Sequence, residues 1–168
     1  MFADSISLAP ALKTRSTAKP ARTQFGLQGF AGETVVRTIF GLRPVSRLVV
    51  GDILLDTRNR MVELHSIRTH HAAAAEIVRV DPSAFGLGLA PGRLDRALLV
   101  GAGQKLGICD WRTEILFAAP TLSAAARLVD GVNLHRADSP ATLYELGFQQ
   151  DTIITADGWT TLISGSGT

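Results

Sequence analysis

Short apolar runs separated by turn residues dominate the chain from residue 34 onward. Val, Ile, Leu and Thr gather in runs too short for helices, and Gly, Pro, Asn and Asp stand between them. Such runs predict β-strands, and the intervening turns predict antiparallel pairing. We therefore expect an all-β fold of about ten short antiparallel strands. The expected strands are 34–39, 53–55, 61–67, 76–80, 97–100, 105–109, 113–117, 142–148, 152–155 and 159–163.

One segment has helical character. Residues 120–129 are rich in alanine, and Thr121 or Ser123 is suited to cap a first helical turn. Asp130-Gly131 then provides a stop signal. The sequence therefore predicts a single short helix over 120–129 in an otherwise β structure. Because hydrophobic residues make up 46% of the chain, there is enough apolar material for a packed core.

The N-terminal residues 1–28 differ from the rest in composition. They carry Lys13, Arg15, Lys19 and Arg22 against Asp4 and show no apolar period. We therefore expect a flexible basic arm over 1–28, and a loose tail over 164–168. A basic arm can contact nucleic acid, so weak nucleic-acid binding is an alternative function, although spaced charges are more typical of a solvated tail.

Cysteine usage and apolar run length indicate the compartment. Cys109 is the only cysteine, which excludes an intramolecular disulfide. No apolar run has the length of a membrane-spanning helix, and residues 6–12 are too short and interrupted for a secretory signal. We therefore expect a cytoplasmic protein with no membrane partner and no cofactor, although leaderless export would leave no N-terminal mark.

The segment ALLVGAGQKLG (97–107) contains glycines in a spacing close to that of dinucleotide-binding turns. That function requires the glycine turn to leave a strand and open a helix, whose N–H groups then face the pyrophosphate. The residues that follow, 106–111, carry no helical period. We therefore predict a turn between two strands here and no nucleotide site.

His65, His70 and His71 raise the question of a metal site. Adjacent histidines on an extended chain point to opposite faces, so His70 and His71 cannot share one ligand set. No Cys, Asp or Glu stands at ligand spacing around them. We therefore predict a solvated loop rather than a metal site.

Residues 29–57, GFAGETVVRTIFGLRPVSRLVVGDILLDT, contain the most informative pattern. This run resembles the opening block of Hedgehog/intein (Hint) domains, especially their bacterial branch. The matching residues are Phe30, Thr34, Thr38, Gly41, Pro44, Val45, Leu48, Gly51, Asp52 and Thr57. Later segments at 96–104, 117–132 and 146–159 resemble further family blocks in the same order. The resemblance implies a Hint-like domain over 29–163, a horseshoe of short antiparallel strands with one short helix.

In the family that this run resembles, the reaction is an autoprocessing acyl shift. A cysteine at the head of the domain attacks the preceding carbonyl, and two histidines assist the proton transfers. The resemblance aligns the cysteine position with Gly29, and the two histidine positions with Gln104 and, to within one residue, Asp151. Neither glycine nor glutamine can replace these groups. The resemblance therefore implies a degenerate active site in which no residue is catalytic.

These substitutions leave three functions to distinguish. The first is a non-catalytic binding or structural module, with a vestigial pocket formed by Gly29, Thr34, Gln104 and Asp151 that receives a peptide or protein partner. The second is self-cleavage, as in protein splicing, with Cys109 or Asp151 as the alternative reactive group. The third is the nucleic-acid binding described above.

Overall fold

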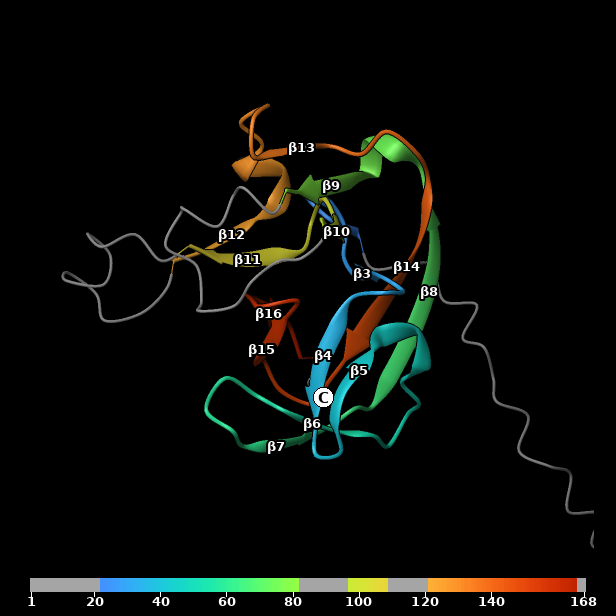
Figure 1. Cartoon of the computed structure of the whole chain (residues 1–168), viewed down its shortest axis with the longest axis vertical. Helices are drawn as coiled ribbons and strands as arrows, with labels where there is room; N and C mark the ends of the chain where they lie inside the picture. The colour runs from blue at the N-terminus through green and yellow to red at the C-terminus, as the bar shows by residue number, and fades with distance from the viewer. Residues whose placement is uncertain (1–21, 82–96, 109–120, 166–168) are drawn as a thin grey trace, which may run out of the picture.

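The structure is a computed structural model that describes residues 22–81, 97–108 and 121–165. Short β-strands occur throughout the described residues (Figure 1). The strands are β1 (Arg22–Thr23), β2 (Gly26–Leu27), β3 (Phe30–Ala31), β4 (Val35–Thr38), β5 (Gly41–Pro44), β6 (Ile53–Leu55), β7 (Met61–Glu63), β8 (Ser66–Ala72), β9 (Ile77–Val80), β10 (Leu98–Gly101), β11 (Lys105–Ile108), β12 (Thr121–Ala124), β13 (Leu134–Arg136), β14 (Ala141–Gly147), β15 (Thr152–Ala156) and β16 (Trp159–Ile163). The all-β prediction is confirmed.

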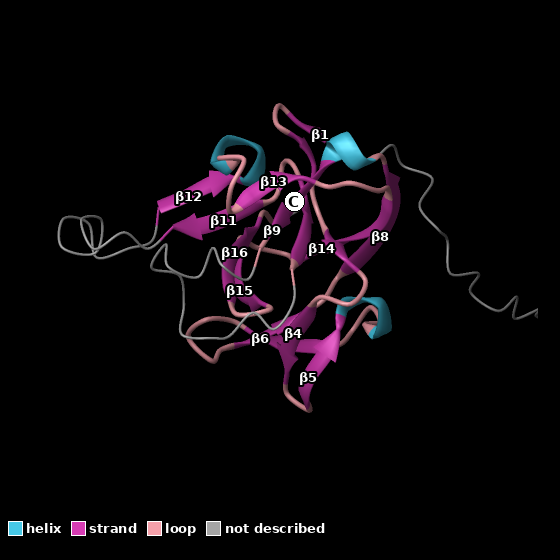
Figure 2. Cartoon of the chain, turned by 45° about the horizontal axis from the view of Figure 1, so that its top comes forward, coloured by secondary structure: helices cyan, strands magenta, loops and turns pink. Residues whose placement is uncertain are grey.

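Two large antiparallel sheets carry most of these strands. A six-stranded sheet has the order β13-β9-β10-β3-β14-β8, and an eight-stranded sheet has the order β12-β11-β16-β15-β4-β6-β7, with β5 paired to β4. A separate hairpin joins β1 to β2. The chain passes between the two large sheets at several points, including the turn from β10 to β11, so that the sheets curl around a shared core (Figure 2).

The core lies where the inner faces of the two sheets meet. Phe30, Val100 and Leu146 from the six-stranded sheet belong to the same buried cluster as Leu54 and Ile154 from the eight-stranded sheet. Alternation along the strands produces this arrangement, because successive side chains of a strand point to opposite faces. β15 and β16, for example, both alternate strictly between buried and half-buried residues.

The helix expected over 120–129 is wrong in its first half. Residues 121–124 form β12, which pairs with β11, and only a 3₁₀ turn over Ala125–Leu128 (η4) is helical. Pairing with β11 satisfies the backbone hydrogen bonds of β12, and this tertiary contact outweighs the helix propensity of alanine. No helix in the described part of the chain is long and apolar enough to cross a membrane.

The solvated loop expected around the histidines is also wrong. Residues 66–72 form β8, paired along its whole length with β14, and His70 is buried. His70 Nε2 lies 2.6 Å from Glu145 Oε2, and Arg68 Nη2 lies 3.7 Å from Glu145 Oε1. His71 is exposed, so the two adjacent histidines do point to opposite faces.

The last residues of the segment that the sequence assigns to the basic arm are structured. The β1–β2 hairpin spans residues 22–27, and Leu27 is buried in a small cluster with Ala72, Ile77 and Leu143. Two sequence-predicted turns also form as expected. Gln104 N–H donates to the carbonyl of Gly101 in the glycine turn between β10 and β11, and Asp157 and Gly158 join β15 to β16 with positive φ angles.

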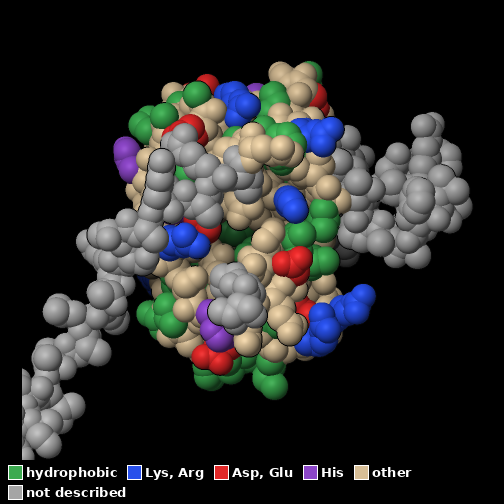
Figure 3. All heavy atoms as spheres, turned by 180° about the vertical axis from the view of Figure 1, so that it is seen from behind, with side chains coloured by type: hydrophobic (Ala, Val, Ile, Leu, Met, Phe, Trp, Pro, Cys, Tyr) green, Lys and Arg blue, Asp and Glu red, His purple; other side chains and the backbone are tan. Residues whose placement is uncertain are grey.

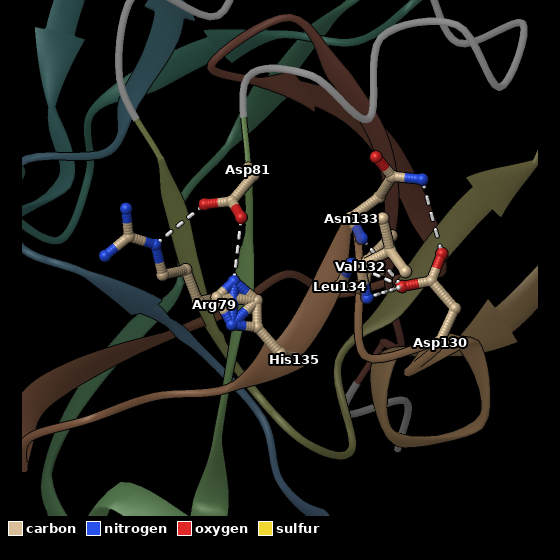
Figure 4. Close-up of polar contacts among 7 residues, drawn as sticks. All are labelled: Arg79, Asp81, Asp130, Val132, Asn133, Leu134 and His135. Atoms are coloured by element: carbon tan, nitrogen blue, oxygen red, sulfur yellow. Dashed lines mark hydrogen bonds and ion pairs between the residues drawn. The ribbon is translucent and has the colours of Figure 1, made fainter.

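Two aspartates organise polar turns elsewhere in the fold. Asp81 lies 2.8 Å from Arg79 Nε and 2.7 Å from His135 Nε2, which ties the end of β9 to β13 (Figure 4). Asp130 accepts backbone N–H groups of residues 132–134, and these bonds, led by that from Leu134, lower its pKa to about 2. Asp130 therefore caps the turn that leads from η4 into β13.

Asp56 closes the β6–β7 turn through three hydrogen bonds. Its Oδ1 accepts the backbone N–H groups of Arg58 and Arg60 at 2.8 Å each, and its Oδ2 accepts Arg60 Nε at 2.7 Å. Burial of this carboxyl raises its pKa, but the hydrogen bonds from Arg60 and Arg58 outweigh burial, so the pKa lies below its ordinary value. The ionised form of Asp56 is therefore the one that stabilises this turn.

Asp56→Asn should lower the free energy of unfolding by about 1–2 kcal/mol at neutral pH, because a charge-assisted acceptor is lost. Since the pKa of Asp56 is lower in the folded chain, its contribution is complete above the unfolded-state pKa of about 4 and disappears as the pH falls through the folded value. The difference between wild type and variant should therefore narrow on acidification. Urea unfolding at neutral and acidic pH measures this. The exposed Asp138→Asn is the control, and an equal effect there would contradict the assignment.

Candidate functional site

The glycine turn between β10 and β11 clamps the backbone of residues 27–29. Gly103 N–H donates to the carbonyl of Leu27 at 2.8 Å, and Gly101 N–H donates to the carbonyl of Gly29 at 2.9 Å. The side-chain Oε1 of Gln104 accepts Gly29 N–H at 3.0 Å. Three hydrogen bonds from one four-residue turn thus surround the Gln28–Gly29 peptide bond.

The glycines of this turn permit a close approach of two backbones. A Cβ atom on Gly101 would collide with the carbonyl oxygen of Leu27 and lie 3.1 Å from the carbonyl carbon of Gln28. A residue with a side chain at 101 therefore could not make the bond to Gly29 without a backbone shift. The glycine turn, whose spacing resembles a phosphate-binding turn, packs its backbone directly against the backbone of residues 27–29.

The orientation of the Gln104 amide follows from its partners. Gln104 is buried, and its Nε2 donates to Thr161 Oγ1 and to the carbonyl of Leu162, both at 2.9 Å. A backbone carbonyl can only accept, so the NH₂ group must face β16 and Oε1 must face Gly29. Thr161 Oγ1 in turn donates to the carbonyl of Lys105 at 2.7 Å. Each side-chain donor of this network therefore has its acceptor within the fold.

Gly29 adopts a conformation that has no room for a side chain. Its φ angle is +121°, and a Cβ atom there would lie 2.8 Å from the carbonyl oxygen of Tyr144. The contact is to the backbone of β14, which pairs with β3 through Tyr144 and Phe30 and with β8 along its length. A backbone held on both sides cannot move aside cheaply, so glycine is required at 29.

The four residues of the expected pocket are not all in contact. Gly29 and Gln104 are hydrogen-bonded, as described. Thr34 is buried in the turn between β3 and β4, and its carbonyl accepts the N–H of Val45, the first residue of η1 (Val45–Arg47), at 2.8 Å. Among the described residues, no hydrogen bond or ion pair links Thr34 or Asp151 to Gly29 or Gln104. The four-residue pocket therefore stays a prediction.

Asp151 faces a different part of the surface. It is exposed, and its Oδ1 accepts Gly165 N–H at 2.7 Å. It lines a depression of about 350 Å³ between the β6–β7 hairpin and residues 148–152, together with Arg60 and Phe148. Cys109 lies outside the described residues. The structure describes no group of three or more His, Cys, Asp or Glu side chains that could hold a metal ion.

Sequence reasoning missed several residues of this site. Thr161 anchors the Gln104 amide, and the backbone of Tyr144 limits position 29. Glu145 follows Tyr144 on β14, opposite Arg68 in the strand register and bonded to buried His70. The alternation of β16 marks Thr161 as inward-facing, but no sequence signal identifies the backbone contact of Tyr144.

Comparison with known proteins places this geometry in a family. The Hint domain family matches residues 28–162, and the chain therefore belongs to the Hint domain family. No curated protein matches the chain.

Solved structures with the same fold come from inteins and an intein-like domain. A bacterial intein-like domain from Clostridium thermocellum is similar with a TM-score of 0.53 at 12% identity, covering 83% of this chain and 100% of that one. The MchDnaB-1 intein gives 0.50 at 12% identity, covering 79% and 98%. The gp41-1 intein gives 0.50 at 10% identity, covering 82% and 98%. The Hint-like horseshoe expected from the sequence is confirmed as a fold.

Gly29→Ala should destabilise the chain by about 3 kcal/mol, because the new Cβ combines a strained φ with a collision against the β14 backbone. Gly41→Ala is the matched control, since Gly41 has a φ of +105° but no atom within 4 Å of the position that a Cβ would occupy. That variant should lose only about 1 kcal/mol. Urea unfolding measures both, and equal losses would show that position 29 is not sterically restricted.

Gln104→Glu should cost about 3 kcal/mol at neutral pH, because a buried carboxylate replaces the two N–H bonds to Thr161 and Leu162 with repulsion between oxygens. Because protonation removes the buried charge, the pKa of the new carboxyl should be higher in the folded chain than in the unfolded chain. The decrease in the free energy of unfolding should therefore become smaller as the pH falls. Unfolding experiments across the acidic range test this. The exposed Gln149→Glu should stay within about 0.5 kcal/mol of wild type.

Proposed function

We propose that this Hint domain is a non-catalytic binding or structural module that holds its N-terminal flank instead of releasing it. The observation that carries the proposal is Gly29. An acyl shift begins when a side-chain nucleophile at this position attacks the carbonyl of Gln28. Gly29 has no such atom, and the carbonyl oxygen of Tyr144, which would lie 2.8 Å from a Cβ at this position, leaves no space for one.

The lack of a described proton donor beside the Gln28–Gly29 peptide bond also supports this proposal. Cleavage requires a proton for the departing nitrogen of residue 29. Among the described residues, the only side-chain atom bonded to Gly29 N–H is Gln104 Oε1, an acceptor. The protons of the Gln104 amide are directed at Thr161 and Leu162. The arrangement therefore binds the intact amide in its planar, unprotonated form.

The hydrogen bonds between the glycine turn and residues 27–29 give this domain a mechanical role, which is to hold the preceding segment in place. Hydrogen bonds from Gly101 and Gly103 hold the carbonyls on either side of Gln28, and the Gln104 side chain holds the N–H that follows. Residues 27–29 thereby become part of the fold, and whatever precedes them remains covalently attached. We expect a peptide or protein partner, if one binds, to contact this junction.

The alternative function is self-cleavage that uses Cys109 or Asp151. The Asp151 carboxylate bonds to Gly165 N–H, at the end of β16, and no described hydrogen bond connects it to Gly29. This geometry favours a structural role for Asp151. Measuring the intact mass of the protein distinguishes self-cleavage by Cys109 or Asp151 from the non-catalytic function.

Full-length protein should keep a single intact mass during prolonged incubation at neutral pH, with and without added thiol, because no group attacks the Gln28 carbonyl. Cys109→Ser and Asp151→Asn should give the same result. A fragment that begins at Gly29 would contradict the proposal. If that fragment forms in the wild type but not in one of the two variants, the residue replaced in that variant is the nucleophile. If the fragment forms in both variants, another group cleaves the bond.

A further inference from the structure

Two neighbouring turns hold large apolar side chains out into solvent. Phe40 lies in the β4–β5 turn with 85% of its surface exposed, and Ile39 and Leu42 flank it on the same hairpin. Val49 and Val50 lie in the turn before β6, Val50 with 61% exposed. Exposed turns usually carry polar residues, and apolar side chains grouped on one surface mark an interaction site.

These two turns lie at the same end of the molecule. Ile39 N–H donates to the carbonyl of Ile53 at 3.1 Å, and Arg43 Nη1 lies 3.5 Å from Asp52 Oδ2. Figures 1 and 2 both show the β4–β5 turn projecting at one extremity of the fold. Hydrophobic side chains are visible at the corresponding lower end in Figure 3. The five side chains Ile39, Phe40, Leu42, Val49 and Val50 are called the apolar tip below.

The backbone of both turns is fixed without help from these side chains. Thr38 Oγ1 donates to the carbonyl of Gly41 and accepts Phe40 N–H, and Asp52 Oδ2 accepts Val49 N–H at 2.9 Å. Glycines at positive φ, Gly41 and Gly51, complete the turns. Since the fold gains nothing from an exposed phenyl ring at position 40, the side chain is free to serve a contact.

The apolar tip continues onto the outer face of the adjoining strands. Leu42 pairs with Arg37, and Leu55 pairs with Met61. Because Thr38 pairs with Leu54, the antiparallel register places Arg37 beside Leu55. Side chains of paired residues share a face, so these four form one row across β5, β4, β6 and β7. Three of the four are apolar.

Exposed arginines lie next to this surface. Arg37 belongs to the row just described, and Arg47 precedes Val49 by two residues; neither forms an ion pair with any described residue. Arg43 is paired with Asp52. Glu63 is the remaining exposed carboxylate on these strands. The surface therefore combines a projecting apolar tip with two arginines that no described carboxylate neutralises.

We propose that the apolar tip docks on an anionic lipid bilayer, with Phe40 and Val50 entering the interface and with Arg37 and Arg47 contacting lipid phosphates. A projecting tip fits a surface that deforms around it, and apolar insertion with flanking basic residues is the chemistry of peripheral membrane binding. A second copy of this chain would present the same positive charge to this face, and like charges repel. This contact is peripheral, requires no membrane-spanning segment, and is independent of the proposed loss of catalysis.

Vesicle co-sedimentation of the full-length chain tests this proposal. Binding to phosphatidylcholine vesicles that contain phosphatidylserine should exceed binding to phosphatidylcholine alone and should weaken with added salt. Phe40→Ser and Val50→Ser should each weaken binding roughly tenfold, because each removes buried apolar area. Val132→Ser is the matched control, since Val132 is 73% exposed but lies in the turn before β13. It should bind as wild type does.

The comparison of variants separates the tip from the basic N-terminal residues, which are present in every variant. Equal binding by Val50→Ser and Val132→Ser would overturn the proposal, as would binding that does not depend on phosphatidylserine. Self-association in solution that Phe40→Ser abolishes would also overturn it, in favour of an interface between copies. Circular dichroism of each variant confirms that the β fold is intact, since both positions lie outside the core.

Discussion

The hydrogen bonds of the Gln104 side chain join the two large sheets, and the arrangement of those sheets depends on them. Gln104 stands in the turn that leaves the six-stranded sheet and enters the eight-stranded sheet. Its Oε1 holds Gly29, beside β3, and its Nε2 holds β16. A buried primary amide can serve both strands because it donates and accepts in one plane. A neutral histidine with one ring proton could not satisfy the same three partners, so the fold favours an amide side chain at position 104.

In the function proposed above, the same hydrogen bonds keep the Gln28–Gly29 bond intact. The polar groups that flank it are already paired within the fold: the carbonyls of Leu27 and Gly29 with the glycine turn, and the N–H of Gly29 with the amide. Catalysis depends on groups that improve their bonding in the transition state. A group that already has its full set of hydrogen bonds in the ground state cannot form a new one to a charge that develops in the transition state.

Much of this fold can be predicted from the sequence, and its failures have physical causes. Alternating apolar residues and turn signals predict β15, β16 and the turn between them. The family resemblance singles out Gly29 and Gln104, which the structure joins by a hydrogen bond. The β12 strand could not be predicted, because its alanines favour a helix and only pairing with β11 reverses that preference. The burial of His70 depends on Glu145, 75 residues away, and the limit at position 29 comes from a backbone carbonyl. Neither kind of contact leaves a local pattern.

The positive φ of Gly29 has a consequence for how such a domain can change over time. Any single substitution that adds a side chain at this position meets the Tyr144 carbonyl and so weakens the structure. A larger residue at 29 is compatible with the fold only if β14 shifts at the same time. We therefore expect variants of this domain to tolerate changes at exposed turns more readily than at this junction.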